Sequence, residues 1–366
     1  MKVLMISKDA SIINGGDTAE RLRQYYLTWA DELCVIIFSN HYEYKDLKNG
    51  LHVYTTGGNV FTQISKAIKL GKKITENNKE WIITTQDPFE TGLVGRKISL
   101  ENKIPWVAQI HTDIGSPFFR KELKNKIRYK IAKKILKYAQ GARVVSERIQ
   151  KFIIKKHFID DKSILVAPIY PETKIVLDNN KNENNKEIHI LMASRLTKEK
   201  NILLALRAIK NLRTKIQNFT LTIKGKGPQE KKIKKFIKDN SMNSYVKIEE
   251  WSSDLSESYK NTDIFLLTSN YEGFGRTVIE AMTYGITVIM TDVGCAGWII
   301  KTGENGIVVP VGSCEYIENS LKKLITDNTL CNKIKEAGKR TAENLPEKEK
   351  YLEEFGSFFK KIYDKQ

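Results

Sequence analysis

The stretch 264–290 constrains the fold most, because it predicts one complete strand–loop–helix–strand unit. The apolar run Ile264–Leu267 predicts a buried strand, and a Gly-Phe-Gly turn at 273–275 follows it. A short helical pattern then ends at Gly285, and the residues 287–290 form a second apolar run. Two strands joined by a crossover helix run parallel, so this unit predicts a parallel sheet covered by helices.

Strand and helix patterns alternate along the rest of the chain, on both sides of a polar break at 178–187. Such a break cannot bury enough apolar surface to form core, so we predict a linker there. A helix is predicted from about Thr18 to Leu33. The other apolar runs predict strands at 2–7, 35–38, 81–85, 106–111, 142–145, 188–193, 219–223, 246–248 and 306–309. The chain therefore divides into two α/β halves, and a cleft between two such halves is a favoured ligand site.

Composition and charge limit the setting of the protein. The 61 Lys+Arg against 43 Asp+Glu give a net charge of +18, which indicates either an anionic partner or a genome-wide bias toward Lys, Ile and Asn. No run approaches the roughly 18 apolar residues that a membrane span needs, and the first residues are too quickly polar for a signal peptide. The 4 cysteines show no CxxC or regular spacing. We therefore expect neither a zinc site nor a disulfide framework, and we expect a reducing, cytosolic setting.

Two carboxylates, Glu272 and Glu280, flank the Gly-Phe-Gly turn. Gly273 and Gly275 allow the backbone to turn sharply and to approach a ligand closely. A helix that begins near Thr277 points its free N–H groups at the same space, which favours a phosphate. Carboxylates bind phosphate poorly but accept hydrogen bonds from sugar and ribose hydroxyls. The stretch therefore predicts a ligand with both sugar and phosphate, and two surface glutamates beside a turn are the alternative.

Three further candidate sites lie where a predicted strand ends. Arg195 and Lys200 follow the strand at 188–193, and both cations are suited to a pyrophosphate. The two glycines within 14–17 can present N–H groups to an anion, although they do not form the G-x-G-x-x-G fingerprint of dinucleotide binding. His111 follows another apolar run, and it is either a partner of a sugar hydroxyl or a structural histidine.

Four motifs, in this order along the chain, resemble those of the retaining glycosyltransferases of family 4, which are group 1 glycosyltransferases: Arg195-x4-Lys200, Lys224-Gly225-Lys226-Gly227-Pro228, Glu272-x7-Glu280 and Gly303-Glu304-Asn305-Gly306. The resemblance implies the α/β GT-B fold, in which two Rossmann-like domains face each other across a central cleft. It implies an acceptor-binding domain over 1–172, a linker over 173–187 and a nucleotide-sugar-binding domain over 188–347. It also implies a last helix, at about 348–366, that packs back on the first domain.

The resemblance further implies a reaction. A sugar moves from a nucleotide-sugar to an acceptor hydroxyl in cell-envelope glycan, polysaccharide or glycolipid synthesis, with retained anomeric configuration and without a metal or other cofactor. The chain has no D-x-D motif, which agrees with a reaction that needs no metal. The residues implied to act on the sugar and the leaving diphosphate are His111, Arg195, Lys200 and Glu272. The residues implied to bind the donor are Gly15, Gly16, Arg195, Lys200, Gly225, Ser252, Glu272, Gly273, Phe274, Gly275, Thr277 and Glu280.

Two other classes of function compete with glycosyl transfer. The enzyme alternative is a nucleotide-sugar epimerase, or a phosphorylase of similar architecture. The alternative without catalysis is a nucleic-acid-binding protein, which the net charge of +18 motivates, but the chain contains no recognisable nucleic-acid-binding module. The sequence identifies neither the sugar, the nucleoside nor the acceptor.

A basic segment runs over 118–138, and Leu123, Ile127, Ile131 and Ile135 recur in it every four residues. This spacing predicts a basic amphipathic helix, which either packs its apolar stripe on the first sheet or lies on an anionic membrane. We expect the stripe mainly to pack on the sheet. The residues expected beside it at a membrane are Phe118, Phe119, Arg120, Lys121 and Lys124. Such contact would place the protein in the cytoplasm, at the inner face of the membrane and near a lipid-linked acceptor.

Overall fold

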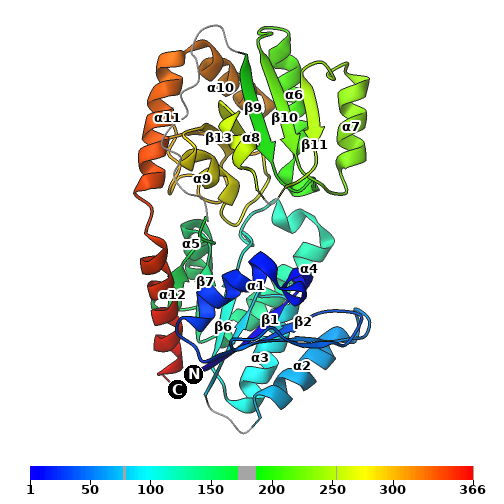
Figure 1. Cartoon of the computed structure of the whole chain (residues 1–366), viewed down its shortest axis with the longest axis vertical. Coiled ribbons are helices and arrows are strands. Elements are labelled where there is room, and N and C mark those ends of the chain that lie inside the picture. The colour runs from blue at the N-terminus through cyan, green and yellow to red at the C-terminus, as the bar shows by residue number, and fades with distance from the viewer. Residues whose placement is uncertain (77–79, 172–186, 253, 366) are drawn as a thin grey trace. The chain divides into compact units, whose positions relative to one another are not determined.

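The chain forms two compact units in a computed structural model, which describes residues 1–76, 80–171, 187–252 and 254–365. Unit 1 comprises Met1–Pro168 and Pro346–Gln366, and unit 2 comprises Ile169–Leu345. The predicted linker over 173–187 lies outside the described residues, except for Glu187. Each unit is built around one sheet (Figure 1).

Unit 1 contains a sheet of 8 strands among its described residues. All neighbouring strands are parallel except β3, which runs antiparallel to β4. The order of the strands across the sheet is β3 (Tyr44–Asp46), β4 (Leu51–Thr55), β2 (Glu32–Ile37), β1 (Lys2–Ser7), β5 (Trp81–Thr85), β6 (Trp106–Ile110), β7 (Gly141–Val144) and β8 (Ile164–Val166). Along the chain, strands are added to one side of β1 and then to the other, so the order reverses between β1 and β5. Ligands of open α/β sheets bind at the carboxyl ends of strands beside such a reversal.

Helices cover the sheet of unit 1, and short turns connect them. The α-helices are α1 (Gly16–Leu22), α2 (Gln63–Ile74), α3 (Glu90–Asn102), α4 (Leu123–Ile135), α5 (Glu147–Lys155) and α12 (Lys348–Tyr363). The shorter helical turns are η1 (Ala10–Asn14), η2 (Arg23–Leu27), η3 (Phe119–Lys121), η4 (Leu136–Tyr138) and η5 (Asp161–Ser163). The predicted helix over Thr18–Leu33 is too long. It is wrong at its end because Glu32 and Leu33 pair with β1 and so belong to the sheet.

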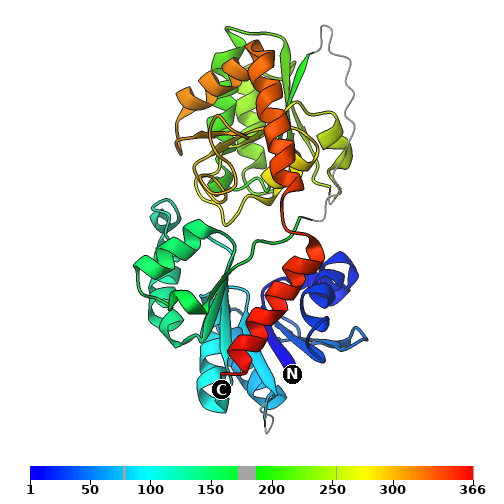
Figure 2. The ribbon, with the colours of Figure 1, turned by 90° about the vertical axis from the view of Figure 1, so that its left-hand side faces the viewer.

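The C-terminal helix α12 packs on η2 within unit 1 (Figure 2). Its aromatic side chains are buried against those of η2 and the residues that follow. Phe359 stacks on Trp29 with ring centroids 5.3 Å apart, and Phe355 meets Tyr25 edge to face at 5.1 Å. The chain thus ends in the unit in which it began.

Unit 2 contains a parallel sheet of 6 strands among its described residues. The order is β11 (Val246–Glu249), β10 (Phe219–Lys224), β9 (Ile188–Ala193), β12 (Ile264–Leu267), β13 (Thr287–Thr291) and β14 (Ile307–Val309). The helices are η6 (Lys198–Lys200), α6 (Ile202–Arg213), α7 (Glu230–Asp239), α8 (Ser256–Lys260), α9 (Arg276–Thr283), α10 (Cys314–Thr326) and α11 (Asn328–Glu343). Leu206 and Ile209 of α6 are fully buried in one core cluster with Leu221 of β10. The strand order reverses between β9 and β12, so the loops that follow these two strands flank the predicted ligand position.

Candidate functional site

Lys200 and Glu272 form an ion pair at the carboxyl ends of β9 and β12. Lys200 ends η6, and Glu272 lies in the loop between β12 and α9. The Ser269 hydroxyl donates a second hydrogen bond to Glu272 Oε1, at 2.7 Å. The backbone N–H of Asn270 donates to the Glu199 carbonyl at 2.7 Å, which fixes the two loops to each other. Two residues that the sequence placed at the donor separately are therefore brought together by the fold.

The Gly-Phe-Gly turn adopts a backbone that requires glycine at one of its ends. Gly275 has φ 98° and is the residue from which α9 begins. The Phe274 side chain is 7% exposed, and its carbonyl accepts from the N–H of Cys295 at 2.8 Å. Gly273 lies in the loop before it, and Thr277 lies in the first turn of α9. The helix begins at Arg276, directly after the left-handed Gly275, which agrees with the predicted start near Thr277.

Glu280 is held on both carboxylate oxygens. It is 7% exposed, its Oε1 accepts from Arg276 Nε at 2.8 Å, and its Oε2 accepts from the Tyr259 hydroxyl at 3.0 Å. Burial and the neighbouring Glu280 carboxylate raise the pKa of Tyr259 above its usual range, so this phenol remains a hydrogen-bond donor. These contacts fix the orientation of Glu280, and the lone pairs that they leave are suited to ribose hydroxyls.

Arg195 is an exposed cation with only a weak partner. Its side chain is 76% exposed, and its ion pair with Glu199 is long, at 3.5 Å. Such an exposed pair contributes little to stability, so the guanidinium can leave Glu199 for a stronger anion at little cost. Arg195 therefore differs from Lys200, whose partner is already in place.

The remaining donor residues of unit 2 lie at the ends of β10 and β11. A Cβ atom at Gly225 would lie 2.0 Å from the Ser194 carbonyl oxygen, so the absence of a side chain allows β10 and β9 to end side by side. Ser252 Oγ accepts from the N–H of Asp254 at 3.2 Å, and the neighbouring Trp251 is 42% exposed. The indole of Trp251 is therefore an exposed aromatic surface next to two of the predicted donor residues, Gly225 and Ser252.

In unit 1, Gly15 and Gly16 follow β1 and open α1. Both have positive φ angles, 74° and 67°, and a Cβ atom at either would meet nothing within 4 Å. Backbone conformation, rather than lack of space, is therefore what favours glycine at these two positions.

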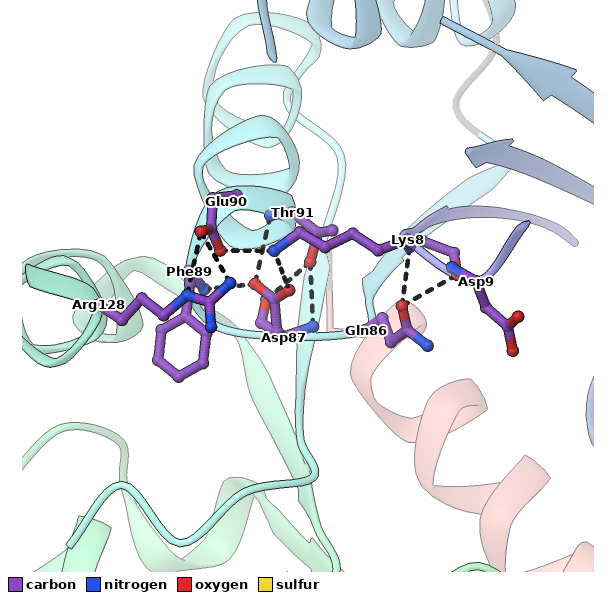
Figure 3. A network of polar contacts seen from close by, with 9 residues as sticks. Lys8, Asp9, Gln86, Asp87, Phe89, Glu90, Thr91 and Arg128 are labelled. Carbon is purple, nitrogen blue, oxygen red and sulfur yellow. Dashed lines mark hydrogen bonds and ion pairs between the residues drawn. The ribbon is translucent and has the colours of Figure 1, made fainter. Parts of the chain in front are cut away.

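A network of charged side chains occupies the reversal point of unit 1 (Figure 3). Lys8, directly after β1, contacts Asp87 at 3.0 Å and Glu90 at 2.5 Å. Glu90 Oε1 also accepts from both Nε and an NH2 group of Arg128, each at 3.0 Å. Burial raises the pKa of Glu90, but the Lys8 hydrogen bond and charge outweigh it, and the net direction is downward. Gln86 joins the network by accepting from the N–H of Lys8 at 2.8 Å.

Sequence reasoning missed this network. The signal was present, because Lys8 directly follows the apolar run 2–7 and Asp87 lies two residues after the run 81–85. Arg128 could not be found in this way, since it comes from α4 and its role depends on how that helix packs.

His111 lies just after β6, with a buried polar cluster beneath it. Its Nε2 is 3.2 Å from Gln109 Oε1 and 3.4 Å from an NH1 group of Arg143. Burial first, and then the charges of Arg143 and Arg21, lower the pKa of His111 from 6.5 to about 3. His111 is therefore a neutral imidazole at physiological pH, able to exchange hydrogen bonds with a hydroxyl.

The predicted membrane residues of the basic segment need correction. Phe119 is 3% exposed and stacks on Phe89 at 6.0 Å, so its prediction as a lipid contact is wrong. Arg120 is half-buried and donates to the Gly115 carbonyl at 3.2 Å. Phe118 is half-buried under Lys121, whose Nζ lies 4.3 Å from the ring centroid, and Lys124 is exposed.

The apolar stripe of α4 is also not packed as expected. Leu123 is 74% exposed and Ile127 is 54% exposed, whereas Asn125, Ala132 and Ile135 are buried. The helix packs through the face that carries the small Ala132, and this face is nearly opposite Leu123 and Ile127 on a helix of 3.6 residues per turn. The prediction that the whole stripe packs on the sheet is therefore wrong for its first half.

The described residues contain no group of three or more His, Cys, Asp or Glu arranged to hold a metal ion. The four cysteines are free thiols. In the described part of the chain, no helix is both long and apolar enough to span a bilayer.

Comparison with known proteins identifies relatives of the chain. Residues 174–341 match the family model described as glycosyl transferases group 1. A 181-residue stretch is 30% identical to the UDP-N-acetylglucosamine–peptide N-acetylglucosaminyltransferase GtfA subunit of Streptococcus gordonii, over 49% of this chain and 35% of the relative. A 230-residue stretch is 28% identical to the capsular polysaccharide biosynthesis glycosyltransferase CapM of Staphylococcus aureus, over 59% of this chain and 60% of CapM. The chain spans about a third of the length of the GtfA relative.

Solved structures share the fold. The apo form of the lipopolysaccharide outer core galactosyltransferase WaaB superposes with a TM-score of 0.72 at 20% identity, over 100% of both chains. Anabaena Alr3699/HepE in complex with UDP and glucose superposes with a TM-score of 0.75 at 17% identity, over 99% of this chain and 100% of HepE. The predicted α/β GT-B fold and the resemblance to group 1 glycosyltransferases are confirmed. The narrower assignment to family 4 stays a prediction.

Proposed function

We infer that this chain, a group 1 glycosyltransferase with the GT-B fold, transfers a sugar from a nucleotide-sugar to an acceptor hydroxyl in cell-envelope glycan synthesis. The observation that carries this proposal is the Lys200–Glu272 pair beside the exposed Arg195, at the strand ends where the sheet of unit 2 reverses its order. Cations suited to a diphosphate and a carboxylate suited to sugar hydroxyls lie at one edge of one sheet. Since HepE and the pneumococcal GtfA were crystallised with UDP, uridine diphosphate sugars are the first donors to test.

The geometry supports a reaction in which fixed cations replace a metal. Negative charge develops on the diphosphate as the glycosidic bond breaks, and Lys200 and Arg195 would stabilise that charge. Glu272 would bind the hydroxyls of the transferred sugar, so it acts as a binding group rather than as one of an acid/base pair. Within this proposal the anomeric configuration is retained, because the leaving phosphate takes the proton of an acceptor that arrives on the same face.

Unit 1 is proposed to bind the acceptor. Its reversal point, between β1 and β5, carries the network of Lys8, Asp87, Glu90 and Arg128. Lys8 and Glu90 each have two partners of opposite charge. Each can therefore give up one partner to a hydroxyl and still keep a charged partner. The network is therefore suited to a polyhydroxylated acceptor such as a sugar of a growing glycan.

The competing functions lack support. The relatives found are glycosyltransferases, and none of the comparisons points to an epimerase, a phosphorylase or a nucleic-acid-binding protein. The basic charge has a different explanation in the proposal, namely attraction to an anionic membrane surface. The exposed Leu123 and Ile127 share their face of α4 with the exposed Lys126, Lys130 and Lys134. This face would hold the protein at the inner surface of the cytoplasmic membrane, near a lipid-linked acceptor.

A two-stage experiment tests the proposed function. Thermal shift against a panel of UDP-, GDP- and dTDP-sugars identifies the donor, because a ligand that binds the folded state raises the Tm. Transfer and hydrolysis of that donor are then measured with and without EDTA, for the wild type and for Glu272→Ala. We expect one donor class to raise the Tm, turnover that EDTA does not reduce, and a loss of at least tenfold in the variant. Binding of DNA with no response to any nucleotide-sugar would overturn the proposal, and abolition of turnover by EDTA would overturn its metal independence.

A further inference from the structure

Arg143 of β7 is a buried cation in unit 1 that no step of the proposed reaction uses. It is 3% exposed, and its guanidinium donates three hydrogen bonds besides its 3.4 Å contact with His111 Nε2. Nε donates to the Ala167 carbonyl at 2.7 Å, an NH1 group donates to Gln109 Oε1 at 2.9 Å, and an NH2 group donates to the Tyr351 hydroxyl at 3.3 Å. Among the described residues, none of these partners is a carboxylate. A buried charge without an opposite charge is costly, so this arrangement is poorly explained as a device for stability alone.

The partners of Arg143 mark both places where the chain leaves unit 1. Ala167 precedes Pro168, the last residue of the first part of unit 1, and Tyr351 lies in the first turn of α12, soon after unit 1 resumes at Pro346. The Tyr351 hydroxyl also donates to the Pro168 carbonyl. One guanidinium and one phenol therefore tie the two chain connections together.

The NH1 group of Arg143 lies beside Gln109 and His111, on the side of the candidate site. The amide nitrogen of Gln109 donates to the Tyr26 hydroxyl at 2.7 Å and to Thr84 Oγ1 at 3.0 Å, so its oxygen is turned toward Arg143 and His111. That oxygen can only accept a hydrogen bond and the Arg143 guanidinium can only donate one, so the two contacts of His111 Nε2 require opposite tautomers. We assign the proton to Nε2 from the shorter contact, 3.2 Å to Gln109 Oε1 against 3.4 Å to Arg143, which leaves Nδ1 as an acceptor. Arg143 fixes the same oxygen from its other side.

We propose that Arg143 is a positioning residue for His111, holding the imidazole in its neutral Nε2–H tautomer and linking its orientation to both chain connections through Ala167 and Tyr351. The proposal rests on the proposed function only where it assigns His111 a role in transfer. The charged groups that act on His111 are Arg143 from β7 and Arg21 from α1. Two titratable phenols lie one contact further away, Tyr26 of η2 on Gln109 and Tyr351 of α12 on Arg143. Both arginines oppose a second proton on the imidazole, and both phenols are buried with raised pKa values and stay neutral.

Three variants and one matched control test this role. Arg143→Met removes the charge, Arg143→Lys keeps it, and Tyr351→Phe removes the hydroxyl while keeping the ring that packs on Tyr25. Ile362→Val is the control, because Ile362 is also buried in α12 but lies against Gly141 at the start of β7. Histidine NMR titration in the full chain follows His111, whose resonance is assigned by its loss in His111→Gln.

We expect His111 not to titrate between pH 5 and 8 in the wild type, in Arg143→Lys or in the control. In Arg143→Met its midpoint should rise toward the ordinary histidine range, and Tyr351→Phe should shift its resonance. Transfer at pH 7 should fall roughly tenfold in kcat/KM in Arg143→Met and recover in part in Arg143→Lys. An unchanged His111 resonance and midpoint in both Arg143→Met and Tyr351→Phe would overturn the proposal. If Arg143→Met does not fold, Tyr351→Phe decides alone, by the same criterion.

The two proposals fail separately in this experiment. The NMR titration needs no turnover, so a changed titration in a protein that transfers no sugar would retain the Arg143 link and refute the proposed function. Normal transfer with an unchanged titration would refute the Arg143 link and retain the proposed function.

Discussion

Lys200 and Glu272 are bonded to each other across 72 residues of sequence, with side chains only 15% and 12% exposed. In the proposed function each residue binds a different part of the donor, the diphosphate and the sugar. Their pairing keeps both charges satisfied before the donor binds. The donor would then complete the site by adding hydrogen bonds around an ion pair that is already oriented, which lowers the cost of ordering the site during reaction.

Removing either member of this pair should affect both activity and stability. We expect Lys200→Ala and Glu272→Ala each to lower kcat/KM at least tenfold, which corresponds to about 1.4 kcal/mol of lost transition-state stabilisation. Each should also destabilise the fold, because the remaining charge is largely buried without its partner. The double variant should be less destabilised than the sum of the single variants in a denaturant-unfolding cycle. Lys198→Ala, at an exposed lysine of the same turn, is the control, and equal effects there would contradict the pairing argument.

Replacing Arg195 should lower the activity but leave the stability nearly unchanged. Because its side chain is 76% exposed and its bond to Glu199 is long, Arg195→Ala should change the unfolding free energy by less than about 1 kcal/mol. The same change should lower transfer roughly tenfold or more, since a cation is lost from the leaving diphosphate. Thermal unfolding and steady-state kinetics on one preparation measure both effects. A large loss of stability with normal turnover would show that Arg195 is structural.

Tyr259 should act on donor affinity through Glu280. Tyr259→Phe removes the hydroxyl that donates to Glu280 Oε2 but keeps the ring. Glu280 then loses this hydrogen bond and keeps its contact with Arg276. We expect a KM for the nucleotide-sugar that is raised severalfold, with kcat changed less, because the ribose is remote from the bond that breaks. Titration calorimetry with the free nucleoside diphosphate measures the affinity directly. An unchanged affinity would contradict the proposal that Glu280 binds the ribose.

The sequence predicted the parts of the site that depend on strand ends and glycines. Glu272 and Lys200 were each assigned to the donor because each follows an apolar run, and parallel strands bring their carboxyl ends to one edge. Their direct ion pair was not predicted, because it joins loops that lie 72 residues apart in sequence. Gly275 was predicted at a turn, and its φ of 98° agrees with that role. This turn is local in sequence, so a single segment contains enough information to predict it.

Features that depend on the packing of one element on another were missed. Phe119 looks like an exposed aromatic in a basic segment, but it is buried because Phe89 of another loop stacks on it. The four-residue period of α4 does not say that the helix packs through Ala132, which leaves Leu123 exposed. Arg143 interrupts an apolar strand, and its partner Tyr351 is 208 residues away, so no local pattern indicates their contact.

His111 should make the fold less stable in acid. Its pKa is about 3 in the folded chain against 6.5 for an ordinary histidine, so between these values the unfolded chain binds a proton that the folded chain does not. The stability that this residue contributes is complete well above pH 6.5 and is lost as the pH falls through that value, by about 1.4 kcal/mol at pH 5.5. Urea unfolding of the wild type and of His111→Gln at pH 7.5 and 5.5 measures the difference. A stability difference between the two proteins that is the same at both pH values would contradict a depressed pKa.

The exposed face of α4 should decide membrane binding. Leu123→Ser and Ile127→Ser together should weaken co-sedimentation with anionic vesicles at least tenfold, since inserting one large aliphatic side chain is worth roughly 1.5–3 kcal/mol. Leu100→Ser is the matched control, because Leu100 is 51% exposed but lies on α3. Neither change should alter the Tm by much, because these side chains pack on little. Raising the salt concentration should weaken wild-type binding, as the lysines of the same face are attracted to the lipid charge. Equal binding to neutral and anionic vesicles, or binding to neither, would refute a membrane role for this face and leave the net charge of +18 as a compositional property of the chain.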